Sequence, residues 1–219
     1  MSVADNDAGR RLGPNSERKV AQILAAARDR FTECGFGGAS MDDVAQLAGV
    51  SKATVYAHFK SKSDLFAAVI ANEGRGFVLA LEQRPGEAID ATLTRFGRAA
   101  FALFLAPHTI AVYRSIAAET SRFPDLGRIF FESGPAFVLS RLAEFLGHAM
   151  ADGLLRRDNP DIAAAQFFSL ILGDLQLRAL VGLTDTISSR ERSAVLVSGV
   201  ATFLRAYERP LKIADRRRR

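Results

Sequence analysis

Hydrophobic residues recur along most of the chain at the three- and four-residue spacing of an amphipathic helix. In the first predicted helix, residues 16–34, this stripe consists of Val20, Ile23, Leu24, Ala27 and Phe31. Gly35 follows and is expected to end the helix. No sustained alternation with a period of two and no Asn-Gly turn occurs, so strands are not favoured. The pattern predicts an all-α fold.

Two short helices with a brief turn between them are predicted next. The first begins after Ser40, whose hydroxyl can cap it, and ends at Gly49. The second begins after Ser51 and turns Val55 and Phe59 toward the core. Two helices joined by a short turn that contains glycine form a helix-turn-helix arrangement, and together with the first helix they predict a three-helix N-terminal domain.

Longer helices rich in Ala, Leu and Phe follow. One is predicted from Ser61 to the region of Arg84. Breaks at Pro and Gly then separate five or more further helices, at about 88–105, 108–121, 125–151, 160–181 and 189–208. Pro135 should kink or split the third of these. The expected organisation is a disordered tail at 1–15, the helix-turn-helix domain at 16–62, a larger helical domain at 63–211 and a basic tail at 212–219.

Composition and charge indicate the cellular compartment and the kind of partner. The single Cys34 cannot form an internal disulfide, as suits a reducing compartment. No apolar stretch is long enough to cross a bilayer, so a cytoplasmic protein without a membrane partner is expected. The net charge is +5, but residues 212–219 alone hold five basic residues and one acid. The acid-free window 48–62, AGVSKATVYAHFKSK, is therefore the better indication of an anionic partner.

The exposed face of the third predicted helix suits a DNA groove. It carries Ala53, Tyr56, Ala57 and Lys60, with Lys52 and Thr54 beside them. Small side chains allow a close approach, and residues in the first turn of a recognition helix reach base edges. Lys52 could contact guanine, and Thr54 could offer a hydroxyl or its methyl group. A single exposed lysine is more often merely solvated, but these residues share one face without an acid.

The run from Ser40 to Leu65, SMDDVAQLAGVSKATVYAHFKSKSDL, resembles the DNA-binding signature of TetR-type bacterial regulators. The resemblance covers roughly residues 16–66 and implies that the third helix enters the major groove. It implies that bases are contacted by Lys52, Ala53 and Thr54, and phosphates by Ser40, Tyr56, His58 and Lys62. Ser40 stands where Thr is commoner, and Ser63 where an acid is common.

The larger domain is similar, over segments between Ala118 and Phe167, to the AefR-like subclass of that family. This resemblance implies a repressor whose C-terminal domain senses a small-molecule effector and dimerises. Candidate pocket residues are Phe101, Phe104, His108, Tyr113, Arg114, Phe130, Phe168, Asp174 and Arg178. Ordinary core packing is the alternative for each Phe. A structural i, i+4 pair is the alternative for Asp174 and Arg178, and an exposed helix start for His108.

A homodimer is expected because two recognition helices must reach half-sites about 34–36 Å apart. The candidate interface consists of the helices at 160–181 and 189–208. Small residues there could allow close approach of a second copy: Ala163, Ala164, Ser169, Gly173, Ala194 and Gly199.

The sequence does not favour an enzyme. Its three histidines share no metal-ligand spacing, and it contains no HExxH, CxxC or phosphate-binding glycine loop. No metal or other cofactor is expected. The predicted function is a ligand-responsive repressor that binds palindromic operator DNA as a dimer and is released by a small molecule. The alternative is a helical ligand-binding or interaction protein without specific DNA binding.

Overall fold

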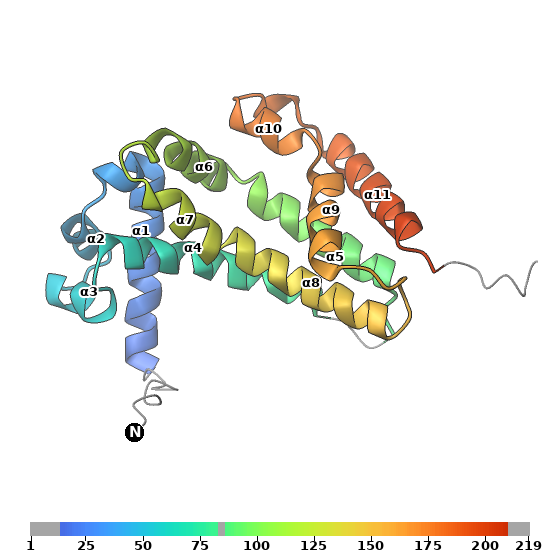
Figure 1. The fold of residues 1–219 in the computed structure, drawn as a ribbon. Helices are drawn as coiled ribbons and strands as arrows, with labels where there is room; N and C mark the ends of the chain where they lie inside the picture. The colour runs from blue at the N-terminus through green and yellow to red at the C-terminus, as the bar shows by residue number, and fades with distance from the viewer. Residues whose placement is uncertain (1–13, 83–85, 210–219) are drawn as a thin grey trace, which may run out of the picture. The chain divides into compact units, whose positions relative to one another are not determined.

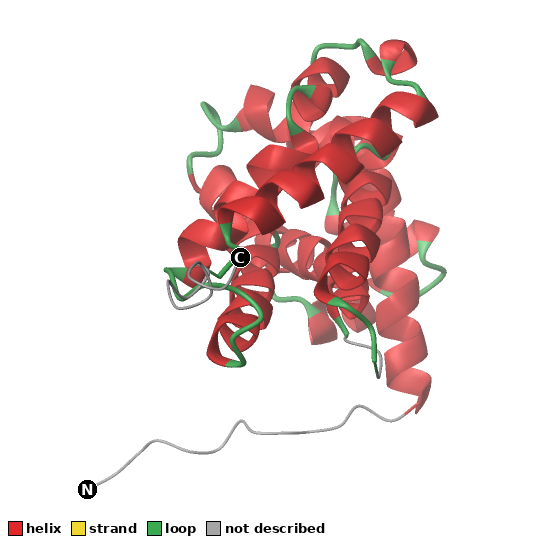
Figure 2. Ribbon diagram, turned by 90° about the vertical axis from the view of Figure 1, so that its right-hand side faces the viewer, coloured by secondary structure: helices red, strands yellow, loops and turns green. Residues whose placement is uncertain are grey.

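The computed structural model describes residues 14–82 and 86–209, and every regular element in these ranges is a helix (Figures 1 and 2). The all-α fold class is thus confirmed. The chain divides into two compact units, residues 1–69 and 70–219. The division lies inside a helix, whereas the sequence analysis placed it between residues 62 and 63. The predicted tails at 1–15 and 212–219 lie outside the described residues, except that the first helix already includes Pro14 and Asn15.

The first unit contains α1 (Pro14–Gly38), α2 (Met41–Leu47), α3 (Lys52–His58) and the start of α4 (Lys62–Val78). Its core includes three phenylalanine rings. The Phe66 ring meets those of Phe31 and Phe36 edge-on, with centroids 5.2 and 5.5 Å away. Gly35 interrupts α1 with a φ of 73°, but helix resumes as far as Gly38. The first regular helix therefore ends at Gly35 as expected, and a second short helical segment follows across a kink, because glycine adopts positive φ without steric cost.

Among the described residues, the second unit contains the rest of α4 and nine further elements. These are η1 (Leu79–Leu81), α5 (Ile89–Phe104), α6 (Pro107–Glu119), α7 (Asp125–Ser133), α8 (Pro135–Ala151), α9 (Pro160–Leu172), α10 (Leu175–Leu180), η2 (Thr184–Thr186) and α11 (Ser189–Ala206). The split before Pro135 is confirmed. The single helix expected at 160–181 was wrong, because Gly173 has a φ of 49° and separates α9 from α10.

The core of the second unit is built where α9 packs against α8 and α11, and α11 against α5. The rings of Phe96, Phe167 and Phe203 are completely buried there. Gly199 lets α11 approach α9 closely, since a Cβ atom at this position would lie 2.8 Å from the carbonyl oxygen of Leu170.

Three of the small residues assigned to a dimer interface lie inside this core. Ala163 and Ala164 are completely buried, and Gly199 is buried as well. They mediate packing within one chain, so their assignment to the surface was wrong. The reason is that small residues permit close helix approach to any neighbour, and here the nearest neighbour belongs to the same chain.

Within the described ranges no single helix is both long enough and apolar enough to cross a membrane. Only α5 and α6 taken together meet these requirements, and they are bent by 62° at the break between them.

Candidate nucleic-acid interface

Two serine caps fix α2 and α3. The hydroxyl of Ser40 accepts a hydrogen bond of 3.1 Å from the Asp43 N–H, and that of Ser51 accepts one of 3.1 Å from the Thr54 N–H. A separate hydrogen bond between the Ser40 hydroxyl and the Asp43 carboxyl is the main cause that lowers the pKa of this carboxyl. Val55 is completely buried and anchors α3 from beneath. The caps and this anchor determine which side chains of α3 face outward.

The outward face of α3 carries most of the residues predicted for it. Lys52 is the first residue of the helix, and Ala53, Tyr56 and Ala57 are exposed on it. Lys60 is also exposed, but α3 ends at His58, so the placement of Lys60 on this helix was wrong. The Tyr56 ring lies 6.0 Å from the ammonium of Lys52. Thr54 is half-buried, and its hydroxyl lies 2.8 Å from that of Ser51, so this hydroxyl already has a partner.

The face is not free of acids, contrary to what the local sequence indicated. The ammonium of Lys52 forms an ion pair of 2.8 Å with the carboxylate of Asp42 on α2. Both side chains are well exposed, 59% and 61% respectively. The hydrogen bond to Asp42 raises the pKa of Lys52. The window 48–62 contains no acid, but the fold brings one in from the preceding helix.

Lys62 lies at the start of α4 and ties the loop before α2 in place. Its ammonium donates a hydrogen bond of 2.9 Å to the carbonyl of Ala39 and a longer one of 3.4 Å to that of Gly37. It also lies 4.6 Å from the centre of the Phe36 ring. This structural role was not foreseen from the sequence.

His58 ends α3 and borders a shallow groove between that helix and the start of α1. The groove has a volume of about 530 Å³ and is lined by Asn15, Ser16, Lys19, Ala53, Thr54, Ala57 and His58. Ser16 and Lys19 were not predicted as site residues. No local pattern could have revealed them, because they reach α3 only through the packing of α1.

Three of the four phenylalanines proposed for an effector pocket pack against other aromatic rings. Phe101 is buried, and the rings of Phe104 and Phe168 meet edge-on at 5.7 Å. The Phe168 ring also meets that of Phe96 at 5.7 Å. Phe130 meets the Tyr113 ring at 4.9 Å. Core packing, the alternative reading, describes these contacts.

Two polar candidates from α6 also have partners in the second unit. Burial raises the pKa of the Tyr113 phenol, whose hydroxyl is hydrogen-bonded to Gln176. The guanidinium of Arg114 donates to the carbonyls of Ala179 and Leu180, at 2.7 and 2.8 Å, and so closes the end of α10. His108 is half-buried rather than exposed, and its Nε2 atom is buried without a hydrogen-bond partner among the described residues.

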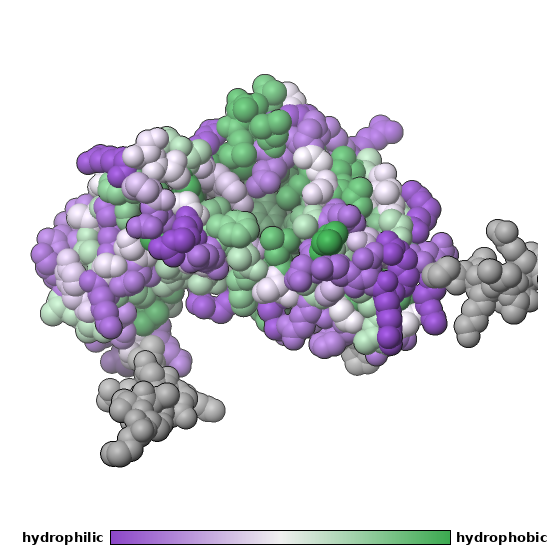
Figure 3. All heavy atoms as spheres, viewed as in Figure 1, coloured by the Kyte–Doolittle hydropathy of each residue, from purple (hydrophilic) through white to green (hydrophobic). Residues whose placement is uncertain are grey.

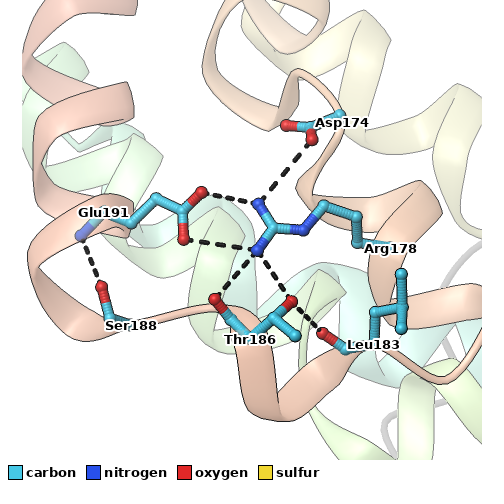
Figure 4. Close-up of polar contacts among 6 residues, drawn as sticks. All are labelled: Asp174, Arg178, Leu183, Thr186, Ser188 and Glu191. Carbon is cyan, nitrogen blue, oxygen red and sulfur yellow. Dashed lines mark hydrogen bonds and ion pairs between the residues drawn. The ribbon is translucent and has the colours of Figure 1, made fainter.

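Arg178 is the centre of a polar cluster between α10 and α11 (Figure 4). Its guanidinium forms an ion pair of 2.6 Å with Glu191 and donates to the carbonyl and hydroxyl oxygens of Thr186, at 2.9 and 2.8 Å. Asp174 lies further away, at 3.7 Å. The predicted pair between Asp174 and Arg178 is therefore present, but Glu191 is the stronger partner.

Two adjoining hollows in the second unit lie away from the predicted pocket residues. The larger, about 320 Å³, is lined by Val78, Leu79, Leu81, Glu82, Arg141, Glu144, Phe145 and His148. The smaller, about 210 Å³, shares Leu81, Phe145 and His148 with it. None of the predicted pocket residues lines either hollow. In the part of the chain that the structure covers, no three His, Cys, Asp or Glu residues are grouped so that they could hold a metal ion.

Comparison with protein families assigns both units. Residues 23–69 match the family described as bacterial regulatory proteins of the tetR family. Residues 91–209 match the family described as the C-terminal domain of AefR-like transcriptional repressors. Both resemblances seen in the sequence are confirmed.

Solved structures share the fold over nearly the whole chain. A TetR-family transcriptional regulator from Mesorhizobium loti MAFF303099 is 28% identical with a TM-score of 0.73, covering 88% of this chain and 98% of that one. The flavonoid-responsive regulator FrrA is 39% identical with a TM-score of 0.70, covering 89% and 100%.

Curated relatives match over a shorter region. The transcriptional activator FasR of Mycolicibacterium smegmatis is 46% identical over 65 residues, which are 30% of this chain and 29% of FasR. The match with this relative therefore spans less than a third of its length. All of these families and relatives are transcriptional regulators.

Proposed function

Because this chain belongs to the TetR family of bacterial transcriptional regulators, we propose that it is a ligand-responsive repressor that binds palindromic operator DNA as a homodimer. The outward face of α3 is the observation that carries this proposal. It presents Lys52, Ala53 and Tyr56 on a helix that two serine caps and a buried valine hold in place. A rigid helix with small and basic exposed residues suits the major groove.

In this proposal base edges are read by the first turn of α3, through Lys52, Ala53 and Thr54. The sugar-phosphate backbone is held by Ser40, Tyr56, His58 and Lys62. The groove between α1 and α3 supports an additional phosphate contact, because Lys19 lines it beside His58. Contacts with phosphates position the protein on DNA, and contacts with base edges specify the sequence. Operator DNA is found in the bacterial cytoplasm, which is the compartment we propose.

Dimerisation is supported by apolar side chains that face outward from the last three helices. They are Ile162 on α9, Leu177 on α10, Val181 directly after it and Val197 on α11. Figure 3 shows an apolar patch over α10. Leu177 and Val181 are each 63% exposed there. A second copy of the chain would bury such residues, and the two-fold symmetry would match a palindromic operator.

A small molecule bound in the second unit is proposed to release the DNA. The hollow beside Phe145 and His148, of about 320 Å³, reaches the lower end of the size range of ligand pockets. FrrA, which this chain matches over its full length, is described as flavonoid-responsive, so flavonoids are the first class of compounds to test. An effector acts to the extent that it binds the DNA-free conformation more tightly than the DNA-bound one.

The test is a mobility-shift titration with the promoter region next to the protein's own gene, together with light scattering of the free protein. We expect a specific complex that weakens with salt, a dimeric mass, and release by at least one flavonoid. If no specific complex forms even at low salt, the repressor proposal is wrong and the alternative of a helical ligand-binding protein replaces it.

A further inference from the structure

The ion pair between Asp42 and Lys52 joins the two helices of the helix-turn-helix on the face proposed to meet DNA. The two residues are ten positions apart in the sequence, and their charged groups lie 2.8 Å apart. About three-fifths of each side chain is exposed, so a macromolecule such as DNA can contact both.

The ion pair contributes little to the stability of the fold. Exposed ion pairs contribute roughly 0–1 kcal/mol to folding. The cap of α2 is provided by Ser40 and the anchoring of α3 by Val55. Asp42 lies in the first turn of α2, where an acid adds about 0.3–1 kcal/mol through the helix dipole, but Asp43 occupies the same turn. A carboxylate near the DNA also weakens binding through repulsion from phosphates. A function in recognition would account for an acid at this position.

Base edges and phosphates differ in what they offer to such a pair. A phosphate presents acceptors only, so it can bind the ammonium of Lys52 but repels the carboxylate of Asp42. The major-groove edge of a G·C pair presents acceptors on guanine and an N4–H donor on cytosine. A donor and an acceptor held side by side therefore match a base edge and mismatch the backbone.

We propose that Asp42 is a specificity-determining residue, which reads a G·C pair together with Lys52 and keeps Lys52 from binding phosphates of non-operator DNA. This inference rests on the proposed DNA-binding function. On random DNA the ammonium stays paired with Asp42 and adds no net attraction. On the operator both partners exchange their mutual bond for bonds to bases.

The experiment starts with DNA duplexes that the wild-type chain selects from a randomised library. Affinity is then measured for the selected duplex and for a scrambled duplex of the same length and composition, across a range of salt concentrations. The proteins are wild type, Asp42→Asn, Lys52→Ala and the double variant. Asp29→Asn is the matched control, because Asp29 is equally exposed and also paired with a cation, Arg28, but lies on α1.

Asp42→Asn should tighten binding to the scrambled duplex by roughly threefold to tenfold and steepen its salt dependence by about one phosphate contact. The ratio of operator to scrambled affinity should fall by at least about fivefold, with relaxed preference at the position that Lys52→Ala also relaxes. In the Lys52→Ala background the same substitution should lower this ratio much less, because the carboxylate then has no ammonium to keep from phosphates. Asp29→Asn should leave the ratio unchanged.

Three outcomes would overturn the inference. They are an unchanged ratio in Asp42→Asn, the same change in the Lys52→Ala background, and an equal change in Asp29→Asn. If the wild-type chain enriches no sequence from the library, the proposed DNA-binding function fails instead, so the two failures are distinguishable.

Discussion

The outward face of α3 and the polar side chains of the second unit both suggested binding sites from the sequence, but the structure gives them different partners. On α3, Tyr56 and Lys52 remain exposed, and the acid that forms an ion pair with Lys52 is equally exposed. In the second unit, Arg114 and Arg178 are bound to carbonyls and carboxylates of neighbouring elements. Lys52 on α3 is available for a ligand, whereas Arg114 and Arg178 hold the second unit together.

The difference shows what kind of sequence pattern indicates a site. The α3 residues were chosen because their spacing puts them on one outward face of a short helix. The pocket residues were chosen by chemical type, as polar or aromatic groups in an apolar region. Such groups commonly find partners inside the protein, because a buried polar group without a hydrogen bond is costly.

The largest expected effect concerns the core that supports α3. Phe66 is 2% exposed and packs edge-on against the rings of Phe31 and Phe36 in the first unit. Phe66→Ala should destabilise this unit by about 3–5 kcal/mol, because a large cavity forms in a small core. The result should be a loss of DNA binding together with part of the helical circular dichroism. Urea denaturation followed by circular dichroism measures the change.

The control is Phe131→Ala, which removes a ring that is largely exposed on α7. Its effect should stay below about 0.5 kcal/mol. Equal destabilisation by the two substitutions would mean that the aromatic cluster around Phe66 does not hold the first unit together.

Arg178→Met tests the polar cluster of the second unit. It removes the bonds to Glu191 and Thr186 and should lower the free energy of unfolding by about 1–3 kcal/mol. Arg190→Met is the control, since Arg190 is a nearby exposed arginine on α11. If Arg178→Met leaves stability unchanged but abolishes binding of an effector, Arg178 belongs with the available cations and the comparison fails.

Substitutions of two tyrosines should have the smallest effects, one on DNA affinity alone and the other on stability alone. Tyr56→Phe removes a hydroxyl from the outward face and should weaken binding to all DNA sequences by roughly threefold to tenfold, with stability unchanged. Tyr113→Phe removes the buried hydroxyl bonded to Gln176. It should lower stability by about 1 kcal/mol with DNA affinity unchanged. Mobility shifts and urea denaturation of both variants measure this. An effect of Tyr56→Phe on stability alone would place its hydroxyl among the structural groups.

Local sequence predicted much of the fold, because helix starts and stops are marked by caps, Pro and Gly. The breaks at Gly49 and before Pro135 were predicted in this way. The break at Gly173 was missed, because the apolar pattern continues across it. The interruption at Gly35 was predicted, but the short helical segment that follows it as far as Gly38 was not.

The exposed face of α3 could be predicted for a similar reason, since it depends on the rotation of one short helix. The partners of its residues could not. Asp42 and Lys52 belong to different helices, and Arg114 is far along the chain from the carbonyls it binds at the end of α10. Such pairs depend on how helices pack, and this information is absent from the periodicity of either helix.

The anchoring of α3 from one side has a consequence for how such proteins diverge. Val55 holds the helix down, while Ala53, Tyr56 and Ala57 on the other side are exposed. Substitutions at these outward positions change few packing contacts, so they cost little in folding free energy. A duplicated gene could therefore acquire a new operator through a few substitutions without first losing a folded product. In α3, selection for a stable fold must preserve the buried residue Val55, whereas selection for a new operator can alter the exposed residues.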